Sequence, residues 1–187
     1  MENKRYELCF AGSGGQGVIL ASIIYAQAAV NGGLYTVQSQ SYGPEARGGS
    51  CCAEAILSET PIHYTKCTHT NFLLALTQSA LNKYLSRVCA GGFLLMDESL
   101  EKPDRDDLRI VALPILKTAK EEVGNPMTAN ILAVGAINTL LELVDDEALL
   151  DAVKRNIPRG TEQINLKAYE AGKALGASAK GRKGARK

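Results

Sequence analysis

The sequence contains no tryptophan, and aromatic residues make up only 5% of its 187 positions. The hydrophobic core must therefore come mainly from alanine, leucine, isoleucine and glycine, a balance that is common in α/β proteins. With 45% hydrophobic and 22% charged residues, the composition is that of an ordinary globular chain. A chain of this length suits one domain with a sizeable core.

The sequence also lacks a candidate membrane span and a secretory signal. Every long apolar run is interrupted by glycine, asparagine or charge, and residues 1–5 form a polar start. The five cysteines, at positions 9, 51, 52, 67 and 89, are odd in number and lack disulfide spacing. We therefore expect a cytoplasmic chain with reduced thiols that does not contact a membrane.

Common signatures of catalytic and metal-binding sites are missing as well. There is no C-x2-C series for iron–sulfur ligation and no G-x4-G-K-[ST] loop for nucleotide hydrolysis. His63 and His69 lie in one short segment, and no acid is placed to orient either of them as a base. Cys67 lies between them, but H-x3-C-x-H is not a zinc spacing. We expect neither catalytic residues nor a metal site in this chain.

Basic residues are concentrated at the end of the sequence. Five of the 21 lysines and arginines lie within the last eight residues, which contain no acid. The remainder has 16 basic against 20 acidic residues, a net charge of about −4, so nucleic-acid binding by the folded part is not expected. Residues 177–187 are interpreted as a disordered basic tail, and contact with an acidic partner or nucleic acid is the alternative.

One glycine-rich stretch lies between a predicted strand at residues 5–11 and a predicted helix at residues 17–31. Three of its glycines fit the G-x-G-x-x-G spacing. Strand, glycine turn and helix N-terminus together direct free backbone N–H groups at an anion, which favours a phosphate-bearing ligand. A tight turn without a ligand is the alternative. The candidate binding residues are Gly12, Ser13, Gly14, Gly15, Gln16 and Gly17.

The second predicted strand, at residues 35–40, counts against NAD as that ligand. A dinucleotide-binding βαβ unit usually has an acid at this point to hold the ribose hydroxyls. In this sequence the strand ends in residues without a carboxylate, namely Gln38, Ser39, Gln40 and Ser41.

A loop rich in glycine, proline and serine follows at residues 41–50. Because Glu45 and Arg47 lie among small residues, the backbone can come close to whatever they contact. One interpretation is an intramolecular Glu45–Arg47 pair that holds the loop shut. The other is a binding site in which Arg47 clamps a phosphate or carboxylate, with Tyr42 and Gly48 as further candidate binding residues.

Two predicted helices, at residues 17–31 and 127–144, are apolar on nearly all sides. Such helices are buried on more than one side, so each needs a cover beyond the sheet, for which another subunit is one candidate. Asn130 and Asn138 interrupt the second helix. Their amides either satisfy loop carbonyls within the domain, or Asn130 reaches a ligand or partner.

Strands alternate with helices along the chain, which predicts a three-layer, Rossmann-like α/β fold with a mostly parallel sheet. An antiparallel hairpin is expected between residues 51–57 and 62–64, and a single domain over residues 1–176. The remaining strands are predicted at 71–77, 93–96 and 110–113, with a turn at 91–92, and the remaining helices at 78–88, 115–123, 146–154 and 162–175.

Three blocks of the sequence together resemble the gamma subunit of the 2-oxoacid:ferredoxin oxidoreductases. They are residues 12–18, residues 38–49 and the Asn-Pro-Met-Thr-Ala-Asn run at 125–130. The blocks are far more specific than a G-x-G-x-x-G pattern, and the likeness runs from about residue 4 to residue 175. The Tyr-Gly-Pro-Glu-Ala-Arg-Gly-Gly form of the second block is closer to the 2-oxoglutarate and branched-chain branch than to the pyruvate or indolepyruvate branches.

This resemblance implies a multi-subunit enzyme that decarboxylates a 2-oxoacid, with 2-oxoglutarate favoured, forms an acyl-CoA and reduces ferredoxin. It implies thiamine diphosphate between alpha and beta subunits, and iron–sulfur clusters in beta and in a ferredoxin-like delta chain. The gamma chain would hold no cofactor tightly and would bind near the path of coenzyme A. Self-association of the isolated chain is a further expectation.

Two other functions remain open from the sequence. The chain is either a scaffold whose glycine loops only permit close subunit packing, or a free-standing NAD- or FAD-dependent oxidoreductase. The second of these depends on the glycine loop alone, and the missing ribose acid counts against it.

Overall fold

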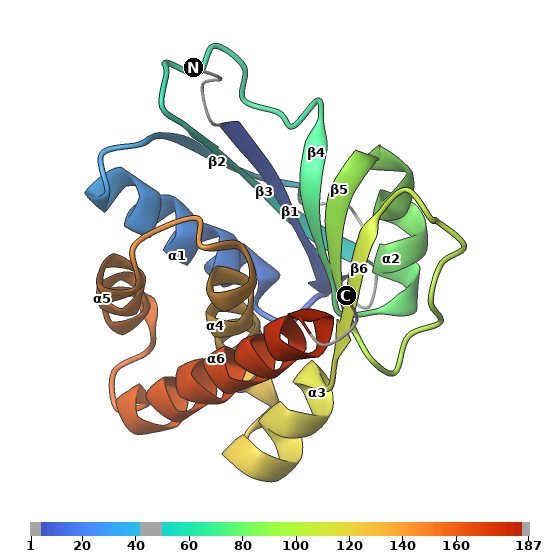
Figure 1. Ribbon diagram of the computed structural model, residues 1–187. Coiled ribbons are helices and arrows are strands. Elements are labelled where there is room, and N and C mark those ends of the chain that lie inside the picture. The colour runs from blue at the N-terminus through green and yellow to red at the C-terminus, as the bar shows by residue number, and fades with distance from the viewer. Residues whose placement is uncertain (1–4, 42–49, 185–187) are drawn as a thin grey trace.

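The computed structural model describes residues 5–41 and 50–184, and its strands form one mixed sheet (Figure 1). The strands are Arg5–Ser13 (β1), Tyr35–Ser41 (β2), Ser50–Ser58 (β3), Thr70–Ala75 (β4), Val88–Asp97 (β5) and Arg109–Leu113 (β6). Their order across the sheet is β2-β3-β1-β4-β5-β6. Neighbours from β1 through β4 and β5 to β6 pair in parallel, whereas β3 is antiparallel to both β1 and β2.

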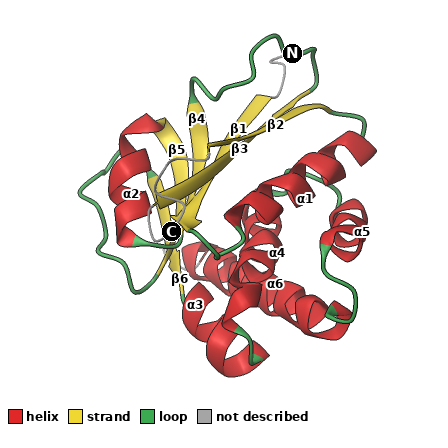
Figure 2. Cartoon of the chain, turned by 180° about the vertical axis from the view of Figure 1, so that it is seen from behind, coloured by secondary structure: helices red, strands yellow, loops and turns green. Residues whose placement is uncertain are grey.

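Helices cover both faces of the sheet, so the predicted three-layer α/β architecture is confirmed (Figure 2). The α-helices are Val18–Asn31 (α1), Gln78–Tyr84 (α2), Ile115–Thr118 (α3), Ala129–Leu141 (α4), Asp146–Asn156 (α5) and Glu162–Gly184 (α6). Short turns of other helix types lie at Leu85–Arg87, Ala119–Val123 and Pro126–Thr128. In Figure 2, α2 lies alone on one side of the sheet and the other α-helices lie on the opposite side.

Two cores follow from this layering, because successive strand residues point to opposite faces. In β1, Leu8 and Phe10 face the larger core beneath α1 and α4. Cys9 and Ala11 face the smaller core beneath α2. A strand that is buried on both faces reads as a continuous apolar run, as this one does.

The two all-apolar helices are covered by other helices of the same chain. α5 packs along α1, and α6 packs along α4 (Figure 1). The second cover that was expected, with another subunit as one candidate, is therefore supplied internally over most of their length. Val30, near the end of α1, still leaves 54% of its surface exposed.

The expected hairpin between residues 51–57 and 62–64 was wrong. β3 lies between β2 and β1, so both of its edges are already paired. Residues 59–69 form no strand, and the carboxylate of Glu7 organises the end of that segment. It accepts hydrogen bonds from the backbone N–H groups of Thr68 (2.6 Å) and His69 (2.7 Å).

The expected turn at residues 91–92 was also wrong, because β5 continues through both glycines. The register between β4 and β5 shifts here, and Gly91 has a left-handed φ of 77°. A Cβ on Gly92 would lie 2.8 Å from the carbonyl oxygen of Cys89. The glycines therefore allow an irregularity within the strand rather than a reversal of the chain.

The last helix is longer than expected. Its predicted end at residue 175 was wrong, because α6 continues to Gly184 and takes in most of the segment that was interpreted as a disordered tail. Ala179 packs against the larger core, and the ammonium group of Lys180 pairs with the carboxylate of Glu142. These contacts with α4 and its end explain why the helix persists.

None of the helices among the described residues has the length and apolar character needed to cross a bilayer.

Candidate functional site at the glycine loop

The glycine loop lies at the carboxyl end of β1, where the strand order of the sheet diverges. From β1 the chain builds β2 and β3 on one side, and β4, β5 and β6 on the other. Open α/β sheets bind ligands at such a point. The strand is two residues longer than predicted and includes Gly12 and Ser13, so the turn itself consists of residues 14–17.

Gln16 folds back over the end of β1. Its side-chain Oε1 accepts a hydrogen bond from the backbone N–H of Ser13 at 2.7 Å, and its own N–H donates to the Ser13 carbonyl at 3.2 Å. A Cβ on Gly12 would lie 2.5 Å from this Oε1. A side chain at position 12 would therefore displace the Gln16 amide from its bond to Ser13, and Gln16 is a structural residue of the turn.

Gly17 connects the loop to the third sequence block, residues 125–130. It is the N-cap of α1 with a left-handed φ of 69°, and its carbonyl accepts a hydrogen bond from Asn130 Nδ2 at 3.2 Å. A Cβ at Gly17 would lie 2.4 Å from that same nitrogen. The sequence left two interpretations of Asn130 open. The structure supports the first, in which its amide satisfies a loop carbonyl within the domain.

Asn138 also serves the fold. Its Nδ2 donates to the Val144 carbonyl at 3.1 Å, and its Oδ1 accepts from the Val144 N–H at 3.3 Å. This pair of bonds closes the turn after α4, and Glu142 there adopts a left-handed φ of 50°. The helix predicted to reach residue 144 therefore ends at Leu141.

The start of α1 retains the features of an anion site. No side chain caps this helix, and its first turn contains no acidic residue. The N–H groups of the first helical turn have no partners within the helix, and the helix dipole adds partial positive charge there. Backbone donors of this kind bind phosphate or carboxylate oxygens.

A cavity of about 230 Å³ opens beside the loop and brings separate parts of the sequence together. The glycine loop meets the 125–130 block here. The side of α1 and the segment before α6 complete the cavity. Its lining residues are Gly15, Gly17, Leu20, Asn125, Met127, Thr128, Asn130, Pro158, Thr161 and Asn165.

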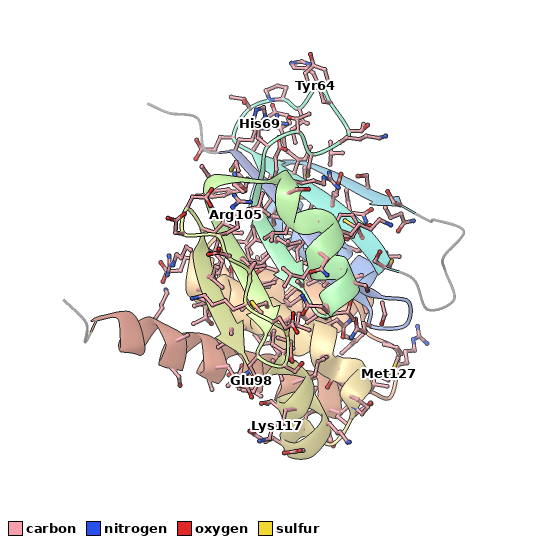
Figure 3. All side chains as sticks on the ribbon, turned by 90° about the vertical axis from the view of Figure 1, so that its right-hand side faces the viewer. Tyr64, His69, Glu98, Arg105, Lys117 and Met127 are labelled. Carbon is pink, nitrogen blue, oxygen red and sulfur yellow. The ribbon has the colours of Figure 1, made fainter. Side chains whose placement is uncertain are left out.

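Among the residues that the structure describes, the lining of this cavity is neutral, with no acidic or basic side chain. It combines amides and hydroxyls with the apolar surfaces of Leu20, Met127 and Pro158. Met127 leaves 63% of its surface exposed, and Figure 3 shows it close to the loop that leads from β1 to α1. Any anionic group bound here must therefore rely on backbone N–H groups or on residues from outside this lining.

Sequence reasoning missed the contribution of Pro158, Thr161 and Asn165. These residues follow α5 and begin α6, where Asn165 Nδ2 donates to the carbonyl and the hydroxyl of Thr161, both at 2.9 Å. Their only sequence signal was a proline–glycine turn, which does not show what the turn lies against. Burial of α6 against α4 places them beside the glycine loop.

The other candidate residues, Tyr42, Glu45, Arg47 and Gly48, lie outside the described residues. The strand residues on either side of that segment are placed. Ser50 of β3 pairs with Ser13 of β1, and Ser41 of β2 pairs with Cys52, two positions further along β3 on its other edge. The strand that follows the segment containing Arg47 thus begins beside the glycine loop, and the strand that precedes it ends one strand further away.

None of the cysteines and histidines is among the described residues that line this cavity. Cys51 and Cys52 face opposite sides of the sheet, as predicted, and the sulfur of Cys52 lies 2.9 Å from that of Cys9. Burial raises the pKa of the Cys67 thiol. His69 is exposed beside Thr68. Within residues 5–41 and 50–184 no three potential metal ligands come together, and the absence of a metal site stays a prediction.

A family model described as pyruvate ferredoxin/flavodoxin oxidoreductase matches residues 7–175. The chain belongs to this family. It is 40% identical over 179 residues to the 2-oxoglutarate synthase subunit KorC of Methanothermobacter marburgensis, and the match covers 91% of this chain and 96% of that relative. It is 31% identical to the ketoisovalerate oxidoreductase subunit VorA of the same organism, covering 91% of this chain and 36% of VorA.

A solved structure agrees with this pyruvate ferredoxin/flavodoxin oxidoreductase membership. The gamma subunit of a keto/oxoacid ferredoxin oxidoreductase from Geobacter sulfurreducens is 41% identical, with a TM-score of 0.86 over 94% of this chain and 98% of that one. The predicted family, its gamma-type chain and the α/β fold are confirmed. The chain is a subunit of a multi-subunit oxidoreductase. This favours a gamma subunit beside the coenzyme A path, or a scaffold subunit, over a free-standing NAD- or FAD-dependent enzyme.

Proposed function

We propose that this chain is the gamma subunit of a 2-oxoglutarate:ferredoxin oxidoreductase. The enzyme would convert 2-oxoglutarate and coenzyme A to succinyl-CoA and carbon dioxide and pass the electrons to ferredoxin. The observation that carries the proposal is the likeness to KorC along nearly the full length of both chains. The match to VorA covers only a third of that longer relative, so a branched-chain oxoacid is the less favoured substrate.

The partners in this proposal are alpha, beta and a ferredoxin-like delta subunit. Thiamine diphosphate would lie between alpha and beta, and the iron–sulfur clusters in beta and delta. This chain would bind neither group and would pack against the catalytic subunits beside the coenzyme A path. Support comes from the names of its relatives, which are subunits of larger oxidoreductases.

The glycine loop is the proposed contact with coenzyme A. The N–H groups of Gly14, Gly15 and Gly17 and of the uncapped start of α1 would hold phosphate or pyrophosphate oxygens, whereas that of Gln16 is bonded within the turn. Arg47 would supply the missing positive charge, since the strand that follows its segment begins at Ser50, beside Ser13 at the loop. Asn130 would support the loop through the Gly17 carbonyl rather than touch the ligand.

Replacing Gly14 by valine in the assembled enzyme tests this role. A branched side chain at the loop would block the approach of a phosphate to the backbone, so we expect the KM for coenzyme A to rise by about tenfold or more. The KM for 2-oxoglutarate should not change. Gly181→Val is the matched control, because Gly181 lies in α6 with nothing within 4 Å of its added Cβ.

The same experiment distinguishes the scaffold hypothesis from a coenzyme A contact at the glycine loop. That hypothesis is favoured by the internal bonds of Gln16 and Asn130, which leave the loop well supported without a ligand. If Gly14→Val assembles normally and keeps its coenzyme A kinetics, the phosphate role is wrong. If Arg47→Ala reduces recovery of the complex on gel filtration while the KM for coenzyme A stays constant, the loops serve subunit packing.

A further inference from the structure

A second cavity, of about 280 Å³, lies at the opposite end of the sheet from the glycine loop. It opens between the first residues of the parallel strands and the end of α4. In Figure 1, α4 and α6 lie against the lower half of the sheet, where β1 ends. The cavity shares no lining residue with the glycine-loop cavity. It is lined by Tyr6, Leu8, Asn71, Phe72, Gly91, Phe93, Arg109, Leu141 and Leu143.

Most of this lining is apolar. The side chains of Leu8, Phe72 and Phe93 form a buried floor on the sheet. Leu141 and Leu143 are partly buried and close the side toward α4. Gly91 has no side chain at the mouth, and a Cβ there would meet nothing within 4 Å. A half-open apolar cavity of this kind favours an apolar group of small size.

The polar side chain of Asn71 is already committed to the fold. Its Oδ1 accepts a hydrogen bond from the Glu7 N–H at 2.9 Å, and its Nδ2 donates to the Arg5 carbonyl at 3.2 Å. Both bonds satisfy the start of β1. Asn71 therefore forms part of the wall and cannot bind a ligand without releasing the strand.

Arg109 is different, because its charge is available. It pairs with Phe93 across β5 and β6, and its Cζ lies 4.8 Å from the centroid of the Phe93 ring. Within the described part of the chain, no carboxylate forms an ion pair with Arg109. The hydroxyl of Tyr6, at the same cavity, likewise has no hydrogen-bond partner among the residues that the structure describes.

We propose that this cavity binds a small apolar monocarboxylate. The carboxylate would pair with the guanidinium of Arg109 and accept a hydrogen bond from the Tyr6 hydroxyl. The apolar tail would lie on the floor of Leu8, Phe72 and Phe93. An uncharged apolar molecule would leave the arginine without a counter-charge, and a highly polar anion would leave the apolar floor unfilled. This site is independent of the proposed coenzyme A contact.

Arg109 has one competing explanation. It lies on β6, an edge strand, and pairs with Phe93, which faces the larger core beneath α1 and α4. Charged residues in such places prevent edge-to-edge association between sheets. A residue with only that task would affect self-association when replaced, whereas a ligand-binding residue would affect affinity for a carboxylate. The two explanations therefore predict different measurements.

The probes are 3-phenylpropanoate and its amide, titrated into the purified full chain labelled at leucine methyl groups for NMR. We expect the acid to shift the methyl signals of Leu141 and Leu143 and the amide to bind about tenfold more weakly. Arg109→Met keeps the stem on Phe93 but removes the charge, so it should weaken binding of the acid about tenfold and leave the amide unchanged. The methyl spectrum of each free variant reports that it is folded.

Arg105→Met is the matched control. Arg105 lies before β6, pairs with Asp107 at 2.6 Å and does not line the cavity (Figure 3). It should bind the acid within twofold of the unaltered chain. Equal affinity for acid and amide, no methyl shifts up to the solubility limit, or an Arg109→Met variant that only self-associates would each overturn the proposal. So would binding that disappears in the assembled enzyme, because the cavity would then be a subunit contact.

Discussion

Single residues decide the shape of the candidate site, and Gly17 and Asn130 are the clearest pair. They are 113 positions apart in the sequence and are joined by the bond from the Asn130 amide to the Gly17 carbonyl. The same contact leaves no room for a side chain at position 17. Glycine is thus required here both for its left-handed φ and for the approach of the amide.

Gly17→Ala should lower the free energy of unfolding by about 2–3 kcal/mol, from backbone strain together with the displaced Asn130 amide. Gly33→Ala is the control, because Gly33 also has a positive φ (83°) but open space around it. It should lose only about 1 kcal/mol. Urea unfolding of the full chain measures both. In an Asn130→Ala background the two alanine substitutions should cost the same, and a persistent difference would show that Asn130 is not the cause.

Among the elements, α4 and α6 form the most extensive contact between two helices in the described part of the chain. Gly135 on α4 and Gly172 on α6 let the two backbones approach. A Cβ on Gly172 would lie 1.9 Å from the carbonyl oxygen of Leu132, and one on Gly135 would lie 2.3 Å from that of Tyr169. Backbone atoms cannot move aside as a flexible side chain can, so the crossing depends on both glycines.

Two alanine substitutions in α6 should therefore have opposite effects. Gly172→Ala forces the helices apart and should destabilise the domain by about 3 kcal/mol or more. Gly181→Ala meets nothing within 4 Å and should stabilise it by up to about 1 kcal/mol through helix propensity. Thermal and urea unfolding report both values. A neutral Gly172→Ala variant would contradict the close crossing.

For the whole molecule, the proposal places the subunit junction at the glycine-loop end. Two exposed apolar residues allow a comparison of the ends. Met127 lines the glycine-loop cavity and is 63% exposed, and Tyr64 is 71% exposed in the segment after β3. Figure 3 shows them at opposite ends of the domain.

Met127→Glu should weaken assembly with the partner subunits, because it places a charge in a surface that would be buried. We expect at least a tenfold lower affinity in a pull-down titration with the alpha and beta chains, whereas Tyr64→Glu should behave as the unaltered chain does. Both substitutions lie on the surface, so circular dichroism should show unchanged folding. The reverse pattern would place the junction at the Tyr64 end.

The sequence alone determined the features that depend on local pattern. The strand, glycine turn and helix of residues 5–31, the alternation of strands and helices, and the three blocks that carry the family likeness are all readable from neighbouring residues. Glycine spacing and apolar periodicity act within one element, so they predict where that element forms. This is why the fold class, the family and the position of the loop at a strand end followed from the sequence.

Only the tertiary structure decided what each element lies against. β3 pairs with β1 and β2 rather than with residues 62–64, and α6 persists to Gly184 because α4 and Glu142 support it. The cavity at the glycine loop takes Thr161 and Asn165 from a segment about 150 residues away along the chain. Pairing and burial partners are set by long-range packing, and no local pattern records them.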